Sequence, residues 1–161
     1  MAVINVTNGT NAFLTLSNVG LANVHPATGT NGIKVPFMQD ITVSATPGTV
    51  RYSTLDSTSS SAFTTVNENS VSLNILVDDD VMFGDSSNTI NSVVRNGLFG
   101  VSKNKEEVFF SVALEGTASG ANFITGKGFI GGLAPSASID QAVFISPMEI
   151  IVNGELTNST V

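Results

Sequence analysis

The sequence lacks cysteine and tryptophan, and its 161 residues include one histidine and one tyrosine. Without cysteine the chain can form no disulfide, no thiolate metal site and no thiol nucleophile. A single histidine also excludes a metal site built from several imidazoles. The shortage of tryptophan and tyrosine argues against a carbohydrate-binding domain, which needs exposed aromatic rings. We expect no catalytic residue, no metal ion and no cofactor.

Charge is also scarce, at 12% of residues, and thirteen acids against six bases leave a net charge of −7. That sign is wrong for a protein that grips nucleic acid. The 42% hydrophobic content is too high for a disordered chain. With so few charges to solvate an exposed surface, the composition indicates one β-rich domain that is largely covered by copies of itself. The first basic residue is Lys34, and no apolar run approaches a membrane span, so we expect neither a signal peptide nor a membrane contact.

Alternating hydrophobicity predicts roughly nine strands, because side chains of a strand point to opposite faces in turn. Pro47-Gly48 and Asn67 to Asn69 have turn composition. The predicted strands cover residues 2–6, 12–17, 38–46, 49–55, 63–66, 70–77, 108–114, 123–131 and 142–152, the last broken at Pro147.

One helix is predicted, because Ile90, Val93, Val94 and Leu98 form a single helical stripe that Gly97 can end. Residues 18–37 form a polar loop that is too long for a plain connector. We therefore predict a mainly β fold: antiparallel β-sandwich or barrel-like sheets with one short α-helix and a long interface loop. The single domain, 1–161, divides into an N-terminal hairpin and loop (1–37), a core (38–156) and a polar tail (157–161).

Three patterns that resemble chemical sites have plainer explanations. The G-x-G-x-x-G pattern at residues 126–131 is not followed by a helix, so its glycines favour close backbone approach or bulges in a sheet. Ser102 and Lys105 match a serine acylase pair but fall in a predicted turn. Asp78 to Asp80 with Asp85 do not fit a calcium loop, and they favour a helix N-terminus.

From about Asp40 onward the sequence resembles the major tail tube proteins of long-tailed, siphophage-like bacteriophages. The resemblance lies in the hairpin stretches 40–43, 49–52 and 69–85, in the helix 88–96, and above all in the closing run 142–156, which ends in Val-Asn-Gly-Glu-Leu. It implies hexameric rings that stack into a hollow tube in the virion tail, after synthesis in the host cytoplasm. The implied partners are the chain itself and the tape measure, terminator and distal tail proteins, with DNA passing through unbound.

An acidic wall suits such a conduit, because it repels DNA phosphates rather than holding them. We predict that the polar strand faces line the lumen, through Asp40, Thr42, Ser44, Arg51, Ser53, Ser70, Ser72 and Asn74. We predict that the long loop contacts the next ring through Asn23, His25, Thr28, Asn31 and Lys34. The alternative is a capsid decoration or fibre-type β-sandwich, which would form trimers on a shell instead of a tube.

Overall fold

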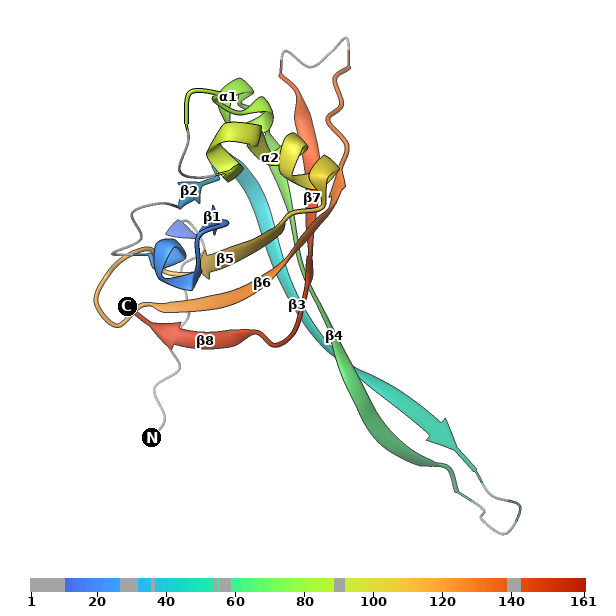
Figure 1. Cartoon of the computed structure of the whole chain (residues 1–161). Helices are drawn as coiled ribbons and strands as arrows, with labels where there is room; N and C mark the ends of the chain where they lie inside the picture. The colour runs from blue at the N-terminus through green and yellow to red at the C-terminus, as the bar shows by residue number, and fades with distance from the viewer. Residues whose placement is uncertain are drawn as a thin grey trace.

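The computed structural model describes residues 11–26, 32–35, 37–53, 55, 59–88, 92–138 and 143–161. The strands in these ranges form one antiparallel sheet with the order β2-β1-β5-β6-β7-β4-β3, and β8 also pairs with β6 (Figure 1). In chain order the elements are β1 (Phe13–Ser17), a 3-10 turn η2 (Leu21–Val24), β2 (Ile33–Lys34), β3 (Met38–Tyr52), β4 (Ser61–Leu76), α1 (Asp79–Phe83), α2 (Ser92–Asn104), β5 (Glu107–Ala113), β6 (Asn122–Leu133), β7 (Ile145–Val152) and β8 (Thr157–Thr160).

The sheet curls around its own core. β2 and β3 occupy opposite edges of the sheet, yet only residues 35–37 separate them along the chain. The two edges must therefore lie close together, and the sheet folds over without closing. The predicted mainly β, antiparallel and barrel-like fold is confirmed, with a single curled sheet in place of separate sheets.

The core consists of the inward-facing residues of this curled sheet together with one side of the helices. Phe110 of β5, Leu14 of β1 and Ile150 of β7 are fully buried and belong to one hydrophobic cluster. Alternate residues on each strand supply the cluster because strand side chains repeat every second residue. Leu98 and Val101 of α2 close one end of it.

The helical region differs from the prediction of one helix at about 88–96. A short helix, α1, begins one residue after Asp78, whose side chain accepts a hydrogen bond from the Val81 backbone N–H at 3.2 Å. α2 runs on to Asn104, and Gly97, predicted to end the helix, forms a kink inside it with φ 65°. Five residues are too few to show a helical stripe, which explains why α1 was missed. No helix in the described ranges is long and apolar enough to cross a membrane.

Two predicted turns are wrong, because β3 and β4 run through them as one long hairpin. Pro47 pairs with Asn67, and the pairing shifts register between Pro47 and Thr49. A proline can occupy this position since β3 is an edge strand and the register shift absorbs the missing N–H. The far half of the hairpin extends away from the rest of the sheet (Figure 1). We call residues 47–52 and 61–67 the arm.

Two further segments are more ordered than the sequence predicts. The polar tail forms β8, in which Thr157 pairs with Thr125 of β6. β8 and β7 therefore pair with successive segments of β6. The long loop contains η2 and the short strand β2. The strand predicted over residues 2–6 lies outside the described residues.

The glycines of the G-x-G-x-x-G pattern serve the sheet, as predicted. A Cβ at Gly126 would come within 2.7 Å of the Phe110 ring, and one at Gly128 would overlap the Ile151 carbonyl. The pairing of β6 with β7 shifts register between Ile130 and Gly132, around Gly131. These positions allow β5, β6 and β7 to approach closely, so the pattern has a structural explanation.

Candidate functional site

The outward face of β3, β4 and β7 gathers six of the predicted lumen residues. In the strand register Thr42 lies opposite Ser72, and Ser72 lies opposite Glu149 of β7. Directly paired residues of an antiparallel sheet point to the same side. We call this surface the channel face and define it by Asp40, Thr42, Ser44, Ser70, Ser72, Asn74 and Glu149.

The channel face is hollowed. An open groove of about 640 Å³ lies over it, and its lining combines polar residues, among them Asp40, Ser72, Asn74 and Glu149, with apolar ones such as Leu133 and Pro147. The lining contains two carboxylates and no lysine or arginine. The groove is therefore acidic, with apolar side chains in its lining.

Asp40 has a structural role in this groove. Its carboxylate accepts hydrogen bonds from the Asn74 backbone N–H at 2.9 Å and from Asn74 Nδ2 at 2.8 Å. The register shifts between Met38 and Asp40, and these bonds reconnect the two strands there. Glu149 is exposed and carries the second negative charge. Sequence reasoning missed Glu149, although Pro147, Glu149 and Ile151 alternate with buried residues along β7 and could have signalled an outward face.

Arg51 and Ser53 do not join the other predicted lumen residues. Arg51 lies in the arm opposite Ala62, and its odd position along β3 places it on the other side of the strand from Thr42 and Ser44. Ser53 follows the last residue of β3. The even-numbered arm positions that continue the channel face are Gly48, Val50 and Tyr52, so this face becomes apolar toward the tip.

Of the predicted inter-ring residues, Asn23 lies in η2, His25 directly follows η2, and Lys34 lies in β2. The His25 ring meets the Phe123 ring edge-on at 5.0 Å, and Lys34 Nζ lies 4.2 Å from the centre of the Phe13 ring. His25 and Lys34 line one hollow of about 1030 Å³, whereas Asn23, in η2, does not contribute to it. Thr28 and Asn31 lie outside the described residues.

The acidic cluster near α1 behaves as a helix start. Asp78 caps α1, and the Asp85 carboxylate accepts the Ser87 backbone N–H at 2.9 Å. Hydrogen bonds from Ser87 lower the pKa of Asp85 below its usual value. Within the described ranges no group of three histidine, cysteine, aspartate or glutamate side chains is arranged to hold a metal ion.

Lys127 and Glu107 form the one ion pair found among the described residues, with 3.7 Å between Nζ and Oε1. Asn153 Nδ2 also donates to this Glu107 oxygen, at 2.7 Å. The pair connects β5 with β6, next to the end of β7. Both of its side chains are partly exposed, so its contribution to stability is small.

Several solved structures of tail and baseplate proteins have a similar fold. A chain in the tail of an empty gene transfer agent particle, refined with C6 symmetry, matches with a TM-score of 0.65 and 12% identity over 96% of this chain and 100% of that one. A chain of the SPP1 tail tube matches with a TM-score of 0.66 and 12% identity over 97% and 80%. A chain of the anti-feeding prophage baseplate, six-fold symmetrised, matches with a TM-score of 0.58 and 10% identity over 99% and 98%.

No protein-family model and no curated protein matches the sequence. The structural matches cover nearly the whole chain, so the chain has the fold of these tail proteins. The resemblance to tail tube proteins that the sequence indicated is confirmed at the level of the fold.

Proposed function

We propose that this chain is a structural subunit of a tail tube of the bacteriophage type, located in the tail of the particle. The observation that carries the proposal is the fold likeness to the SPP1 tail tube chain over 97% of this chain. The composition supports it independently, since a surface poor in charge suits a protein covered by its own copies. This role is mechanical and needs no catalytic group.

The finer assembly is a ring of six subunits that stacks on further rings. The C6 symmetry of the gene transfer agent tail and the six-fold baseplate support the number six. A ring requires heterologous contacts, in which different surfaces of neighbouring subunits meet. β3 supplies one such surface, because it is an edge strand whose outer side has no partner among the described strands.

The channel face would line the tube, with DNA passing along it. Asp40 and Glu149 repel phosphates, while Thr42 and Ser72 keep the wall hydrated. A net charge of −7 per subunit adds to this repulsion, so the wall would not retain DNA. The cost is repulsion between subunits, which the interfaces must offset.

The subunit would also contact neighbouring rings and other tail proteins. Asn23, His25, Thr28, Asn31 and Lys34 would contact the next ring, and tape measure, terminator and distal tail proteins would bind the ends of the tube. Subunits would pass through the host cytoplasm before assembly. We favour this role over a capsid decoration protein because the structures compared above are described as tail and baseplate structures.

Electron microscopy of the purified protein tests the role directly. Hollow tubes or six-fold rings, formed spontaneously or on tube fragments added as seeds, are the expected result. Monomers at every concentration and salt level, with and without seeds, would contradict a tail tube, and trimers would favour the decoration protein.

The channel assignment has its own test. Ser72→Lys with Glu149→Lys should leave tube assembly intact but make the tubes retain DNA, with a salt slope steeper by about one unit for each new phosphate contact. Asp40 is left unchanged because its bonds to Asn74 hold the strands together. Thr157→Lys with Glu155→Lys makes the same charge change at two exposed positions around the start of β8, outside both hollows, and it should not retain DNA. Loss of assembly in the Ser72 and Glu149 variant would place these residues at an interface.

A further inference from the structure

Three polar side chains from neighbouring strands meet on the outward side of the sheet. Glu107 begins β5, Lys127 belongs to β6, and Asn153 directly follows β7. The Glu107 Oε1 atom lies 3.7 Å from Lys127 Nζ and accepts a hydrogen bond from Asn153 Nδ2 at 2.7 Å. An amine and a carboxamide are therefore held against the same carboxylate oxygen. We call these three residues the amide cluster.

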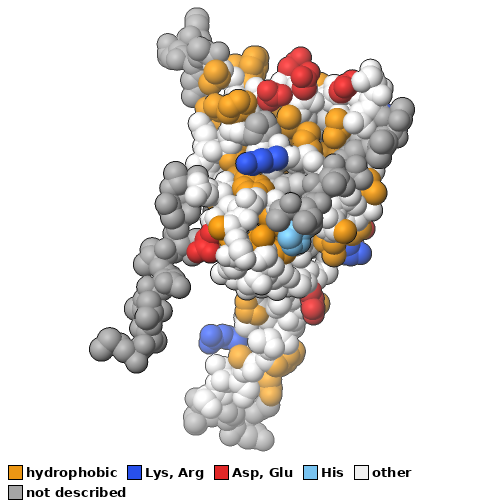
Figure 2. Space-filling model, turned by 90° about the vertical axis from the view of Figure 1, so that its left-hand side faces the viewer, with side chains coloured by type: hydrophobic (Ala, Val, Ile, Leu, Met, Phe, Trp, Pro, Cys, Tyr) orange, Lys and Arg blue, Asp and Glu red, His pale blue; other side chains and the backbone are white. Residues whose placement is uncertain are grey.

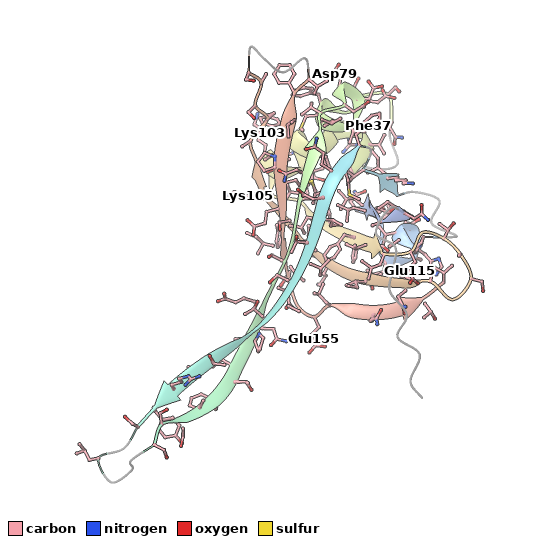
Figure 3. All side chains as sticks on the ribbon, turned by 180° about the vertical axis from the view of Figure 1, so that it is seen from behind. Phe37, Asp79, Lys103, Lys105, Glu115 and Glu155 are labelled. Carbon is pink, nitrogen blue, oxygen red and sulfur yellow. The ribbon has the colours of Figure 1, made fainter. Side chains whose placement is uncertain are left out.

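The strand register brings the three side chains together. The Asn153 backbone N–H donates to the Lys127 carbonyl at 2.7 Å, which continues the pairing of β6 with β7 by one residue. Residues paired in this way point to the same side, with Cβ atoms about 5 Å apart. Glu107 is a diagonal neighbour of Lys127 across β5 and β6, two residues out of register, so it shares that side. Figure 3 labels Glu155 just beyond the cluster, between β7 and β8.

Basic side chains are scarce in this chain, so the neighbours of each one are informative. Only six of 161 residues are lysine or arginine, and Figure 2 shows the basic side chains of one face far apart. Among the described residues Lys127 is the one that forms an ion pair. The chain also has no cysteine, so a covalent link between strands needs a chemistry other than a disulfide. An amine, a carboxamide and a shared carboxylate supply such a chemistry.

We propose that Lys127 Nζ and Asn153 Cγ become joined by an isopeptide bond within one chain, with Glu107 as the proton carrier. Glu107 takes a proton from the Lys127 ammonium group, because only the neutral amine is a nucleophile. The amine attacks Asn153 Cγ, so the Nζ–Cγ bond forms and the Cγ–Nδ2 bond breaks. Glu107 passes its proton to the departing nitrogen, which also receives the second proton that Nζ loses. Ammonium is released, Glu107 is a carboxylate again, and no electron is transferred.

The chemistry of the cluster makes the carboxamide the electrophile. Attack on the Glu107 carboxylate would have to expel an oxide from a negatively charged group, whereas attack on Asn153 exchanges one amide bond for another. Glu107 Oε1 is within hydrogen-bond reach of the leaving nitrogen, as a proton donor must be. Glu107 is thus the catalytic residue of a reaction that each chain undergoes once.

Apolar side chains flank the amide cluster. Phe129 and Ile151 pair with each other on the same side of the sheet and are 37% and 54% exposed. The side chains of Lys127 and Glu107 are 48% and 33% exposed, so water reaches both in an isolated chain. Removal of water favours a neutral amine and a neutral carboxyl over the charged pair, and that proton transfer is the first step. The bond forms within one chain, so the inference goes beyond the proposed tail tube and does not depend on it.

Trypsin digestion detects the bond, because Lys127 is the last basic residue of the chain. The purified protein is incubated at about pH 9, where more of the lysine amine is neutral than at neutral pH, then denatured, digested and measured by mass spectrometry. An unreacted chain gives the fragments 106–127 and 128–161. A reacted chain gives one fragment, 106–161, that is lighter than the uncleaved sequence by one ammonia molecule.

Two variants and one internal control accompany the wild type. Lys127→Arg keeps the charge and the cleavage site but cannot form the bond, and Glu107→Gln keeps the shape but cannot carry the proton. Asn104 Nδ2 also donates to a carboxylate, that of Glu106, at 3.2 Å, but no lysine pairs with this carboxylate among the described residues. Asn104 should keep its amide nitrogen, so the intact mass should fall by one ammonia molecule and no more.

We expect the wild type to gain the bond, Glu107→Gln to gain it about a hundredfold more slowly, and Lys127→Arg never to gain it. The bonded chain should melt about 5 °C or more above Lys127→Arg, because the bond closes a loop in the unfolded chain. Complete cleavage after Lys127 in free and assembled protein would overturn the proposal and leave the tail tube standing. Hydrolysis of Asn153 to aspartate with both fragments present would also overturn it. Equal rates in the wild type and Glu107→Gln would overturn the role of Glu107.

Discussion

β3 and β4 behave differently in their two halves. In the half that lies within the curled sheet, Val71 and Leu73 of β4 are 0% and 3% exposed, because they belong to the hydrophobic core that the sheet encloses. In the arm the same strand exposes more than half of Phe63 and nearly all of Val66. Backbone pairing between β3 and β4 continues through both halves. The difference lies in the layer above the strands, which is present in one half and missing in the other.

This contrast separates residues that stabilise the subunit from residues available to a partner. Burial of apolar area, and not strand pairing, supplies most of the stability of a sheet. Side chains of the arm bury little area within one molecule, so they contribute little to its folding. Their apolar character is then best explained by a contact between molecules.

The largest expected effect is a difference in stability between two phenylalanine-to-alanine variants, one in the core and one in the arm. Phe110→Ala removes a fully buried ring and should cost about 3–5 kcal/mol, which lowers Tm by more than about 6 °C. Phe63→Ala, in the arm, should change Tm by less than about 2 °C yet weaken assembly. Thermal unfolding of dilute protein by circular dichroism, together with light scattering of concentrated protein, measures both. Equal loss of Tm in the two variants would mean that the arm packs into the subunit.

A second pair of variants tests how closely the molecule is packed around two glycines outside the arm. Gly97 has φ 65°, and a Cβ there would lie 2.6 Å from the Gly84 nitrogen and overlap the Met82 carbonyl, where α1 and α2 meet. Gly97→Ala should therefore cost about 2–4 kcal/mol.

The control for this substitution is Gly120→Ala. Gly120 has φ 85°, but no atom lies within 4 Å of the position that an alanine methyl group would take, so only the backbone conformation opposes the change. We expect a loss of about 1 kcal/mol from urea unfolding. If both variants lose the same amount, close packing between the two helices contributes nothing.

The sequence predicts the body of the sheet better than the arm. In residues 70–77 one face is buried, so hydrophobic and polar residues alternate and the strand is found. In the arm neither face is buried, and the alternation fades around Pro47 and Asn67. The local composition there favours turns, and this makes the prediction wrong, because pairing between β3 and β4 keeps these residues extended. The offset of α2 has a similar origin, because a kink at Gly97 lets the helix continue where a helix end was expected.

The sequence predicts which residues of β3 and β4 point to the channel face, but it does not predict which strand lies beside them. Alternation identifies Thr42 and Ser72 as outward-facing, and both lie on one surface. That Glu149 lies beside Ser72 depends on the pairing of β4 with β7, which are more than seventy residues apart in the chain. No local pattern encodes such a pairing. The placement of Arg51 depends on β3 continuing through Pro47, which the predicted turn obscured.

A third prediction concerns Glu106, whose carboxylate connects both ends of α2. Ser92 Oγ donates to Glu106 Oε2, while Asn96 Nδ2 and Asn104 Nδ2 donate to Oε1 at 3.0 Å and 3.2 Å. The Ser92 bond, more than any other contact, lowers the pKa of Glu106 below its usual value, although partial burial opposes the shift.

A lowered folded-state pKa stabilises the protein above the unfolded pKa, and this contribution is lost as the pH falls through the folded value. Glu106→Gln should therefore cost about 1 kcal/mol at neutral pH, allowing for solvent screening, and flatten the fall of Tm between about pH 5 and pH 3. Melting curves across that range measure it, with Glu155→Gln, at an exposed position, as the control. Parallel curves for the wild type and Glu106→Gln would contradict the assignment.

The smallest expected effect is a gain of stability at the end of α2. Lys105 has φ 56°, and the bonds Lys105 N–H to Ser102 O and Glu106 N–H to Val101 O, both 3.1 Å, form a Schellman motif whose left-handed position favours glycine. Lys105→Gly should raise stability by about 0.5–1 kcal/mol, or Tm by about 1–4 °C, because the lysine Cβ no longer strains the turn. Lys105→Ala removes the same charge and keeps the Cβ, so it should bring no gain. A similar gain from both variants would assign the effect to charge. Neither variant should alter assembly, because the turn lies outside the arm.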